Sequence, residues 1–90
     1  MARKEFETLT PQMFYILLSL YEPLCGLEIM EKVNEMTEGD VSVGAGTLYA
    51  LLPRFENIGY IQLLKEEKKK KMYIITQKGK ERLELEKEKM

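Results

Sequence analysis

The segment from residue 46 to 58 places its large apolar side chains along one side of a helix and is followed at once by a glycine. These apolar residues, spaced at i, i+3, i+4, i+7 and i+10, are Leu48, Leu51, Leu52, Phe55 and Ile58. Gly59 favours the left-handed conformation that ends many helices. The pattern predicts a helix that is packed on a core along a single stripe and is free on its opposite face.

The segments around this helix define the remaining elements. Thr10 and Pro11 are typical of a helix start, and Thr76 is a good cap for a last helix. Two short apolar runs that flank a charged segment are typical of a β-hairpin. The expected elements are helices at about 11–21, between Gly26 and Gly39, at 46–58 and at 77–90, and strands at 60–64 and 72–75 joined by a charged loop at 65–71. The predicted fold class is mainly α with a small β-hairpin (α+β): one winged helix-turn-helix domain, residues 1–90, in the order α-α-α-β-β-α.

The composition argues against an enzyme, a metalloprotein or a membrane protein. The sequence has no histidine that could act as a general base, and its single cysteine, Cys25, has no histidine partner. It also lacks metal-ligand motifs and a phosphate-binding loop with its lysine. The apolar run at residues 13–18 is much shorter than the roughly 20 residues that span a bilayer. We therefore expect a soluble cytoplasmic protein without a cofactor.

Positive charge is concentrated near the expected hairpin. Residues 65–82 contain eight lysines and arginines and three glutamates, a net charge of +5 in a chain whose net charge is -1. Four adjacent lysines, residues 68–71, stand at the hairpin tip. A flexible cationic tip suits the phosphate backbone or the minor-groove edge of DNA. A solvated loop that serves only solubility remains the simpler alternative.

The free face of the helix at 46–58 carries side chains that suit a nucleic-acid groove. Small residues allow close approach, and Thr, Tyr, Arg and Asn hydrogen-bond base edges or phosphates. An ordinary surface helix is an equally good interpretation of this face. Pro53 removes one backbone hydrogen bond and is expected to kink the helix. The candidate DNA-binding residues of the helix and hairpin are Ser42, Gly44, Gly46, Thr47, Tyr49, Ala50, Arg54, Asn57, Lys68, Lys69, Lys70, Lys71 and Tyr73.

The first helix is apolar on two sides, which suggests a partner subunit. A helix that is apolar nearly all round is buried on more than one side, and a domain of this size struggles to bury both itself. We therefore expect a homodimer. The predicted interface residues are Phe14, Leu18, Tyr21 and Leu83.

Three stretches resemble the N-terminal domain of the PadR-like transcriptional regulators. They read LTPQMFYILLSLYEPLCGLEIMEKV, GAGTLYALLPRFENIGYI and MYIITQKGKERLE, and together they cover about residues 8–85. The Gly-Thr-Leu-Tyr core at 46–49, Gly59 and the Thr76-x-x-Gly79 pair are in register with the family pattern. The sequence departs from that pattern at Cys25 and Leu27, where His and Tyr are common, and at Pro53.

The resemblance implies a dimeric, cytoplasmic repressor with a winged helix. It places Thr47 and Tyr49 on the recognition helix, residues 68–71 at the wing tip, and the helix after Thr76 in dimerisation. Relatives continue past the position of Met90 into a long C-terminal helix. Multidrug-sensing relatives bind flat aromatic ligands through interface tryptophans, which this sequence lacks, so any small-molecule inducer is unknown.

Three functions follow as hypotheses. The first is a sequence-specific DNA-binding repressor that acts as a homodimer on an inverted-repeat operator in double-stranded DNA. The alternative is a winged-helix protein–protein interaction module without specific DNA binding. A third is a small-molecule sensor. Salt dependence separates the first two, because binding through several lysines to phosphates weakens log-linearly with salt.

Overall fold

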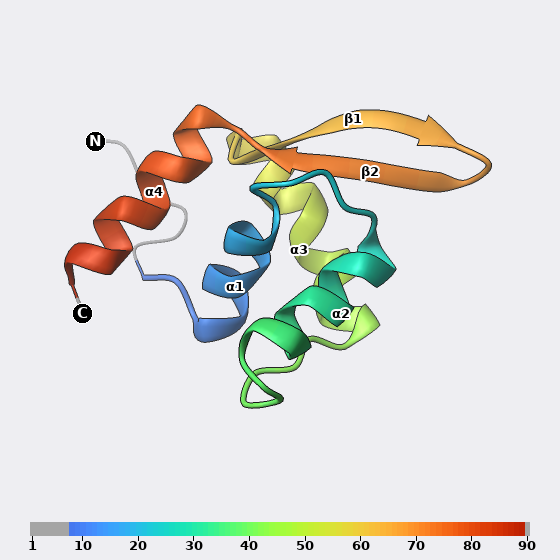
Figure 1. Ribbon diagram of the computed structural model, residues 1–90. Helices are drawn as coiled ribbons and strands as arrows, with labels where there is room; N and C mark the ends of the chain where they lie inside the picture. Colours follow the sequence, from blue (N-terminus) through green and yellow to red (C-terminus); the bar gives the residue numbers. More distant parts are fainter. Residues whose placement is uncertain (1–7, 90) are drawn as a thin grey trace.

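The computed structural model describes residues 8–89 and has the element order expected from the sequence (Figure 1). Four helices and one antiparallel hairpin make a winged helix-turn-helix, which confirms the predicted fold class. The elements are α1 (Pro11–Ser19), α2 (Gly26–Met36), α3 (Ala45–Ile58), β1 (Ile61–Glu67), β2 (Lys70–Ile75) and α4 (Gln77–Glu88).

One hydrophobic core lies where the helices meet the base of the hairpin. α1 packs against both α2 and α4, whereas α3 packs against α2 and β1. The hairpin extends away from this body, and α4 lies at the opposite end of the molecule from the hairpin tip (Figure 1). The largest fully buried side chains are those of Ile16, Leu17, Leu20, Ile29, Leu48, Leu52, Phe55, Ile61 and Leu83.

α1 begins as the sequence predicted. Of the residues expected on its second apolar side, Phe14 is buried within the chain, whereas Leu18 is partly buried and Tyr21 is 45% exposed. The Thr10 hydroxyl accepts a hydrogen bond from the backbone N–H of Met13 at 3.2 Å, and Pro11 occupies the first helical turn. α4 lies against the second apolar side, where Phe14 is 8% exposed and Leu83 is fully buried. Phe14 is therefore buried without a partner subunit, whereas Tyr21 remains exposed.

The hairpin is longer and tighter than the sequence suggested. β1 and β2 pair from Ile61↔Ile75 out to Glu67↔Lys70, with a bulge between Leu63 and Lys65. The expected charged loop at 65–71 is thus mostly strand. Only Lys68 and Lys69 form the turn, with φ of 49° and 67°. Two successive left-handed residues fit the right-handed twist of a hairpin but are usually Asn or Gly, so two lysines carry no turn signal at this point.

The base of the hairpin is bonded to the segment after α1. Leu24 and Tyr73 exchange two backbone hydrogen bonds, of 3.1 and 2.9 Å, and the Ile75 N–H donates to the Leu20 carbonyl at 2.8 Å. These bonds satisfy backbone groups along β2 that β1 does not reach. The hairpin is therefore fixed to the helical body at its base, while its tip extends freely.

The Thr76-x-x-Gly79 pair joins α4 to the end of α3. The Thr76 hydroxyl lies within hydrogen-bonding distance of the Gly59 and Tyr60 carbonyls and accepts the Gly79 N–H at 3.1 Å. Gly59 ends α3 with φ of 97°, as the sequence predicted. A Cβ on Gly79 would lie 2.3 Å from the Tyr60 carbonyl oxygen, so only glycine fits. Lys78 Nζ adds a hydrogen bond to the last α3 carbonyl, that of Ile58, at 2.8 Å.

A buried ion pair fastens the other end of α4. Glu86 is 7% exposed and accepts a hydrogen bond from Arg82 Nη1 at 2.9 Å. Burial alone would raise the pKa of the Glu86 carboxyl, but Arg82, the Leu9 backbone N–H and Lys89 together lower it below the usual value. The ionised carboxylate therefore ties the segment before α1 to α4.

Candidate nucleic-acid interface

α3 presents one bare, polar face to solvent. Its opposite face is buried at Leu48, Leu51, Leu52 and Phe55, as the stripe predicted. Pro53 lies inside the helix on the exposed side, and the helix continues through it to Ile58. The candidate residues on and just before α3 are all exposed: Ser42, Gly44, Gly46, Thr47, Tyr49, Ala50, Arg54 and Asn57.

The start of α3 is open to an anion. Gly44 is the N-cap, and no side chain within residues 8–89 caps the first N–H groups. A Cβ on Gly44 or Gly46 would meet nothing within 4 Å, so these glycines leave space in front of the helix. Gln12 Nε2 donates to the Ser42 carbonyl at 2.9 Å and holds the loop that precedes the helix. Uncapped N–H groups with free space in front of them can receive a phosphate.

Tyr49 is positioned by the first turn of α2. A Cβ on Gly26 would lie 2.3 Å from the Tyr49 hydroxyl oxygen, so the ring lies directly over this glycine. Tyr49 nevertheless remains 56% exposed. Sequence reasoning missed Gly26, because its partner is distant in the chain. Its place just before a helical pattern indicated only a break between the first and second helices.

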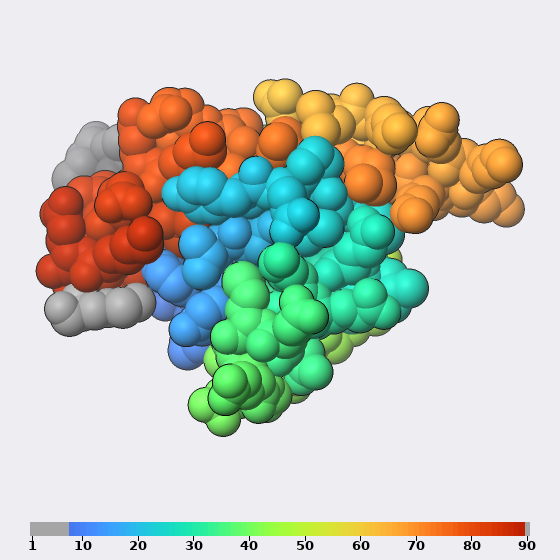
Figure 2. Space-filling model, in the orientation of Figure 1, coloured from blue at the N-terminus to red at the C-terminus, as the bar shows by residue number. Residues whose placement is uncertain are grey.

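The hairpin, or wing, carries its charge at the tip. Residues 68–71 are all exposed: two lysines form the turn and two belong to β2. In the space-filling view the wing projects beyond the helical body (Figure 2). A nearby ion pair, Lys65 to Glu67 at 3.6 Å, neutralises part of the strand charge. The wing tip therefore offers lysine ammonium groups to an anionic partner.

Tyr73 lies at the base of the wing rather than on its surface. It is only 8% exposed. Burial raises the pKa of its hydroxyl, and the charges of Glu56 and Glu66 raise it further. The expectation that Tyr73 directly contacts DNA together with the lysines does not fit this burial. Its neighbours in β2, Met72 and Ile74, are partly buried, and the Tyr73 side chain belongs to the hydrophobic core.

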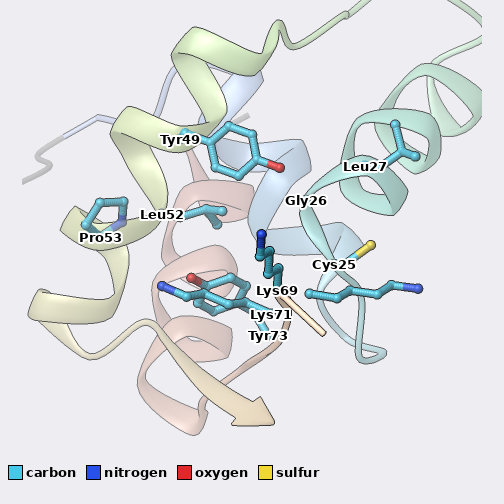
Figure 3. Close-up of a pocket in the computed structure, with 10 residues that line it drawn as sticks. Cys25, Gly26, Leu27, Tyr49, Leu52, Pro53, Lys69, Lys71 and Tyr73 are labelled. Atoms are coloured by element: carbon cyan, nitrogen blue, oxygen red, sulfur yellow. The ribbon is translucent and has the colours of Figure 1, made fainter. Parts of the chain in front are cut away.

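A groove separates the wing from α2 and α3, and we call it the wing groove (Figure 3). Its volume is about 570 Å³. The Tyr49 hydroxyl points toward Gly26 across the groove, and Lys69 and Lys71 reach in from the wing (Figure 3). Its lining residues are Cys25, Gly26, Leu27, Tyr49, Leu52, Pro53, Lys69, Lys70, Lys71 and Tyr73. No sequence pattern indicated this groove, because its lining comes from three separate segments.

Two acidic side chains around the start of α2, those of Glu22 and Glu28, take part in an ion pair or a hydrogen bond. The Glu28 carboxylate accepts the Cys25 N–H at 2.9 Å. This bond, the Cys25 thiol and the Lys70 charge lower the pKa of Glu28. Glu22 pairs with Lys32 at 2.9 Å. Part of the acidic charge around the start of α2 is therefore neutralised, and Lys69, Lys70 and Lys71 line the facing side of the groove.

Within the described residues, two other kinds of site find no support. No three His, Cys, Asp or Glu side chains gather where they could hold a metal ion. None of the helices formed by residues 8–89 is both long and apolar enough to cross a membrane.

Comparison with known proteins gives the family. Residues 15–85 match the transcriptional regulator PadR-like family. A transcriptional regulator from Clostridium thermocellum is 29% identical with a TM-score of 0.73, over 88% of this chain and 82% of that one. RosR from H. salinarum has the same fold, with 24% identity and a TM-score of 0.75, over 94% of this chain and 76% of that one. Comparison with curated proteins gives no significant match. The chain belongs to the transcriptional regulator PadR-like family.

Proposed function

We propose that this regulator binds specific sequences of double-stranded DNA, with α3 in the major groove and the wing on the phosphate backbone. The observation that carries the proposal is the exposed polar face of α3 beside the exposed lysines of the wing. A helix fits the major groove, where Thr47, Arg54 and Asn57 have the hydrogen-bonding groups that read base edges. The bare start of α3 accepts a flanking phosphate.

The wing lysines supply affinity that does not depend on sequence. Each ammonium group that neutralises a phosphate releases a counterion, so binding weakens as salt rises. The turn at Lys68 and Lys69 holds two of these groups at the far end of the wing, where a DNA backbone is within reach. A protein-interaction module that uses apolar surface would lack this steep salt dependence.

We further infer that two copies act together as a cytoplasmic repressor on an inverted repeat. Phe14 and Leu83 are buried, so the dimer surface must use what remains exposed on the α1–α4 side. The Tyr21 side chain is 45% exposed, and the centroid of its ring lies 5.4 Å from Lys80 Nζ of α4. Leu85 of α4 is 56% exposed. Leu18 is partly buried against the core. A two-fold axis between two α3 helices requires half-sites related by inversion, about 34 Å apart or a multiple of that distance.

Two measurements test this function. Salt titration of binding to a duplex from the upstream promoter should give a log-linear loss of affinity, with a slope of about one unit per phosphate contact. Footprinting should protect an inverted repeat, and analytical ultracentrifugation should show a dimer. Binding that is insensitive to salt would favour the protein-interaction alternative. A single asymmetric half-site, or a monomer at tens of micromolar, would remove the dimer.

A further inference from the structure

Gly26 is buried beneath an exposed tyrosine of α3. Gly26 is the first residue of α2 and is buried, whereas Tyr49 is 56% exposed. The three heavy atoms nearest to a Cβ on Gly26 would all belong to the Tyr49 side chain: the hydroxyl oxygen, then Cζ at 2.9 Å and Cε1 at 3.1 Å. The hydroxyl end of Tyr49 therefore occupies the space that a side chain at position 26 would fill.

The backbone at Gly26 does not itself require a glycine. Among residues 8–89, the glycines with positive φ are Gly39 and Gly59, so the conformation at Gly26 is open to other residues. Gly26 lies within a helix, where alanine is the better helix former. The missing side chain at position 26 is therefore explained by the Tyr49 ring and not by the course of α2.

The Tyr49 hydroxyl is held at the wing groove. Tyr49 and Gly26 both line this groove, and the hydroxyl points toward the glycine across it (Figure 3). Lys69, Lys70 and Lys71 line the same groove from the wing. A tyrosine hydroxyl can donate a hydrogen bond to a phosphate oxygen, and lysine ammonium groups neutralise phosphate charge. The groove thus combines one held hydroxyl with several cations on flexible stems.

A side chain that is held before DNA arrives contributes more to affinity than a free one. Immobilising a free side chain on binding costs affinity, and a side chain that already has its bound conformation avoids this cost. A Cβ at position 26 would push the Tyr49 ring toward solvent, where it regains rotational freedom. Gly26 therefore controls whether the Tyr49 hydroxyl is ready for a contact.

We propose that Gly26 is a positioning residue for DNA binding, which holds Tyr49 where its hydroxyl donates a hydrogen bond to a backbone phosphate. This inference rests on the proposed function. It assigns to Tyr49 a contact that does not depend on the base sequence, unlike the contacts proposed for Thr47 and Asn57.

Gly26→Ala tests the proposal with fluorescence anisotropy on a random-sequence duplex and on a duplex from the upstream promoter. Affinity for both duplexes should fall by roughly threefold to tenfold, the cost of immobilising one free side chain. Thermal melting checks that the variant is folded. Wild-type affinity of folded Gly26→Ala for both duplexes would overturn the proposal. A loss confined to the promoter duplex would overturn the phosphate contact, because Tyr49 would then read bases.

Tyr49→Phe tests the hydroxyl without touching Gly26. It keeps the ring and removes the hydrogen-bond donor, so it should also weaken binding to both duplexes by similar factors. Wild-type affinity of Tyr49→Phe for both duplexes would overturn the phosphate contact.

A double-mutant cycle separates positioning from a general effect on the fold. Tyr49→Ala removes the ring that a Cβ at position 26 would displace. Gly26→Ala should therefore cause no further loss of DNA affinity in the Tyr49→Ala background. The same loss with and without the Tyr49 ring would overturn the proposal, because the glycine would then act through the fold of α2.

A measurement without DNA separates this inference from the proposed function. Nuclear Overhauser contacts between the Gly26 α-protons and the Tyr49 ring should be present in the free wild type, and their absence would overturn the positioning role. If these contacts are present and the wild type binds neither duplex, the proposed function fails and the DNA-binding role of Gly26 falls with it. If the wild type binds both duplexes and Gly26→Ala binds them equally well, this inference alone fails.

Discussion

α1 and α3 are both rich in large apolar residues, but the chain covers α1 on two sides and α3 on one. α1 lies between α2 and α4, and its Ile16 and Leu17 are fully buried. α3 packs on α2 and β1 and leaves a row of exposed positions, among them Thr47, Ala50 and Asn57. The difference assigns α1 to the architecture and leaves one face of α3 for a partner. Changes to α1 should therefore alter stability, and changes to the outer face of α3 should alter binding alone.

The largest expected effect is on the second apolar side of α1. Phe14→Glu buries an unpaired charge in the hydrophobic core beside α1, which should cost about 3 kcal/mol or more of the free energy of unfolding. Ala50→Glu on the exposed face of α3 should change it by less than about 0.5 kcal/mol. Urea denaturation followed by circular dichroism measures both. A stable, monomeric Phe14→Glu variant would contradict this picture and return Phe14 to a subunit interface.

A smaller effect is expected where α3 is joined to α4. Thr76→Ala removes the cap of α4 and the hydroxyl contact with the Gly59 and Tyr60 carbonyls. The loss should be about 1–2 kcal/mol. Thr76→Ser keeps the hydroxyl and is the matched control, expected to retain most of the stability. Thermal melting of the three proteins gives the comparison. Equal melting temperatures for Thr76→Ala and the wild type would show that α3 is held in place without this joint.

The ion pair that fastens α4 beside α1 should make stability depend on pH. The pKa of Glu86 is lowered in the folded protein from an unfolded value near 4.5. The stabilisation is thus present above that value and is lost as pH falls through the lower, folded pKa. Glu86→Gln should flatten the decline of stability in acid. Glu84→Gln, whose carboxylate is exposed and pairs with Lys87 at 3.3 Å, should not. Parallel acid profiles for both variants would count against a buried, ionised Glu86.

The fold could be predicted from local signals, because each signal determines the secondary structure of the segment that contains it. The leucine stripe of α3, the left-handed Gly59 and the Thr76 cap are read within a few residues. The burial of Phe14 within its own chain could not be predicted in this way. An apolar stripe shows that a side is covered, and only the tertiary arrangement shows that α4 of the same chain covers it.

Only part of the candidate site could be predicted, because only part of it depends on local signals. The outer face of α3 follows from the stripe by elimination, and all of its predicted residues are exposed. The wing was wrongly expected to end in a loop, because lysines rather than Asn-Gly form its turn. Tyr73 was placed on the surface because strand alternation does not show which face is buried. The wing groove needs Gly26, Tyr49 and the wing together, a contact between distant segments that no local pattern contains.

The most direct test of the account is a comparison of α3 and wing variants in competition binding to DNA. Wild type, Asn57→Ala and a variant with alanine at residues 68–71 are titrated on the operator and on random duplex at two or more salt concentrations. Asn57→Ala should weaken operator binding by about 1–3 kcal/mol and leave random DNA and most of the salt slope unchanged. The wing variant should weaken both duplexes by similar factors and flatten the salt slope. Loss of discrimination in the wing variant with discrimination kept in Asn57→Ala would contradict these roles, as would unchanged DNA binding in both variants.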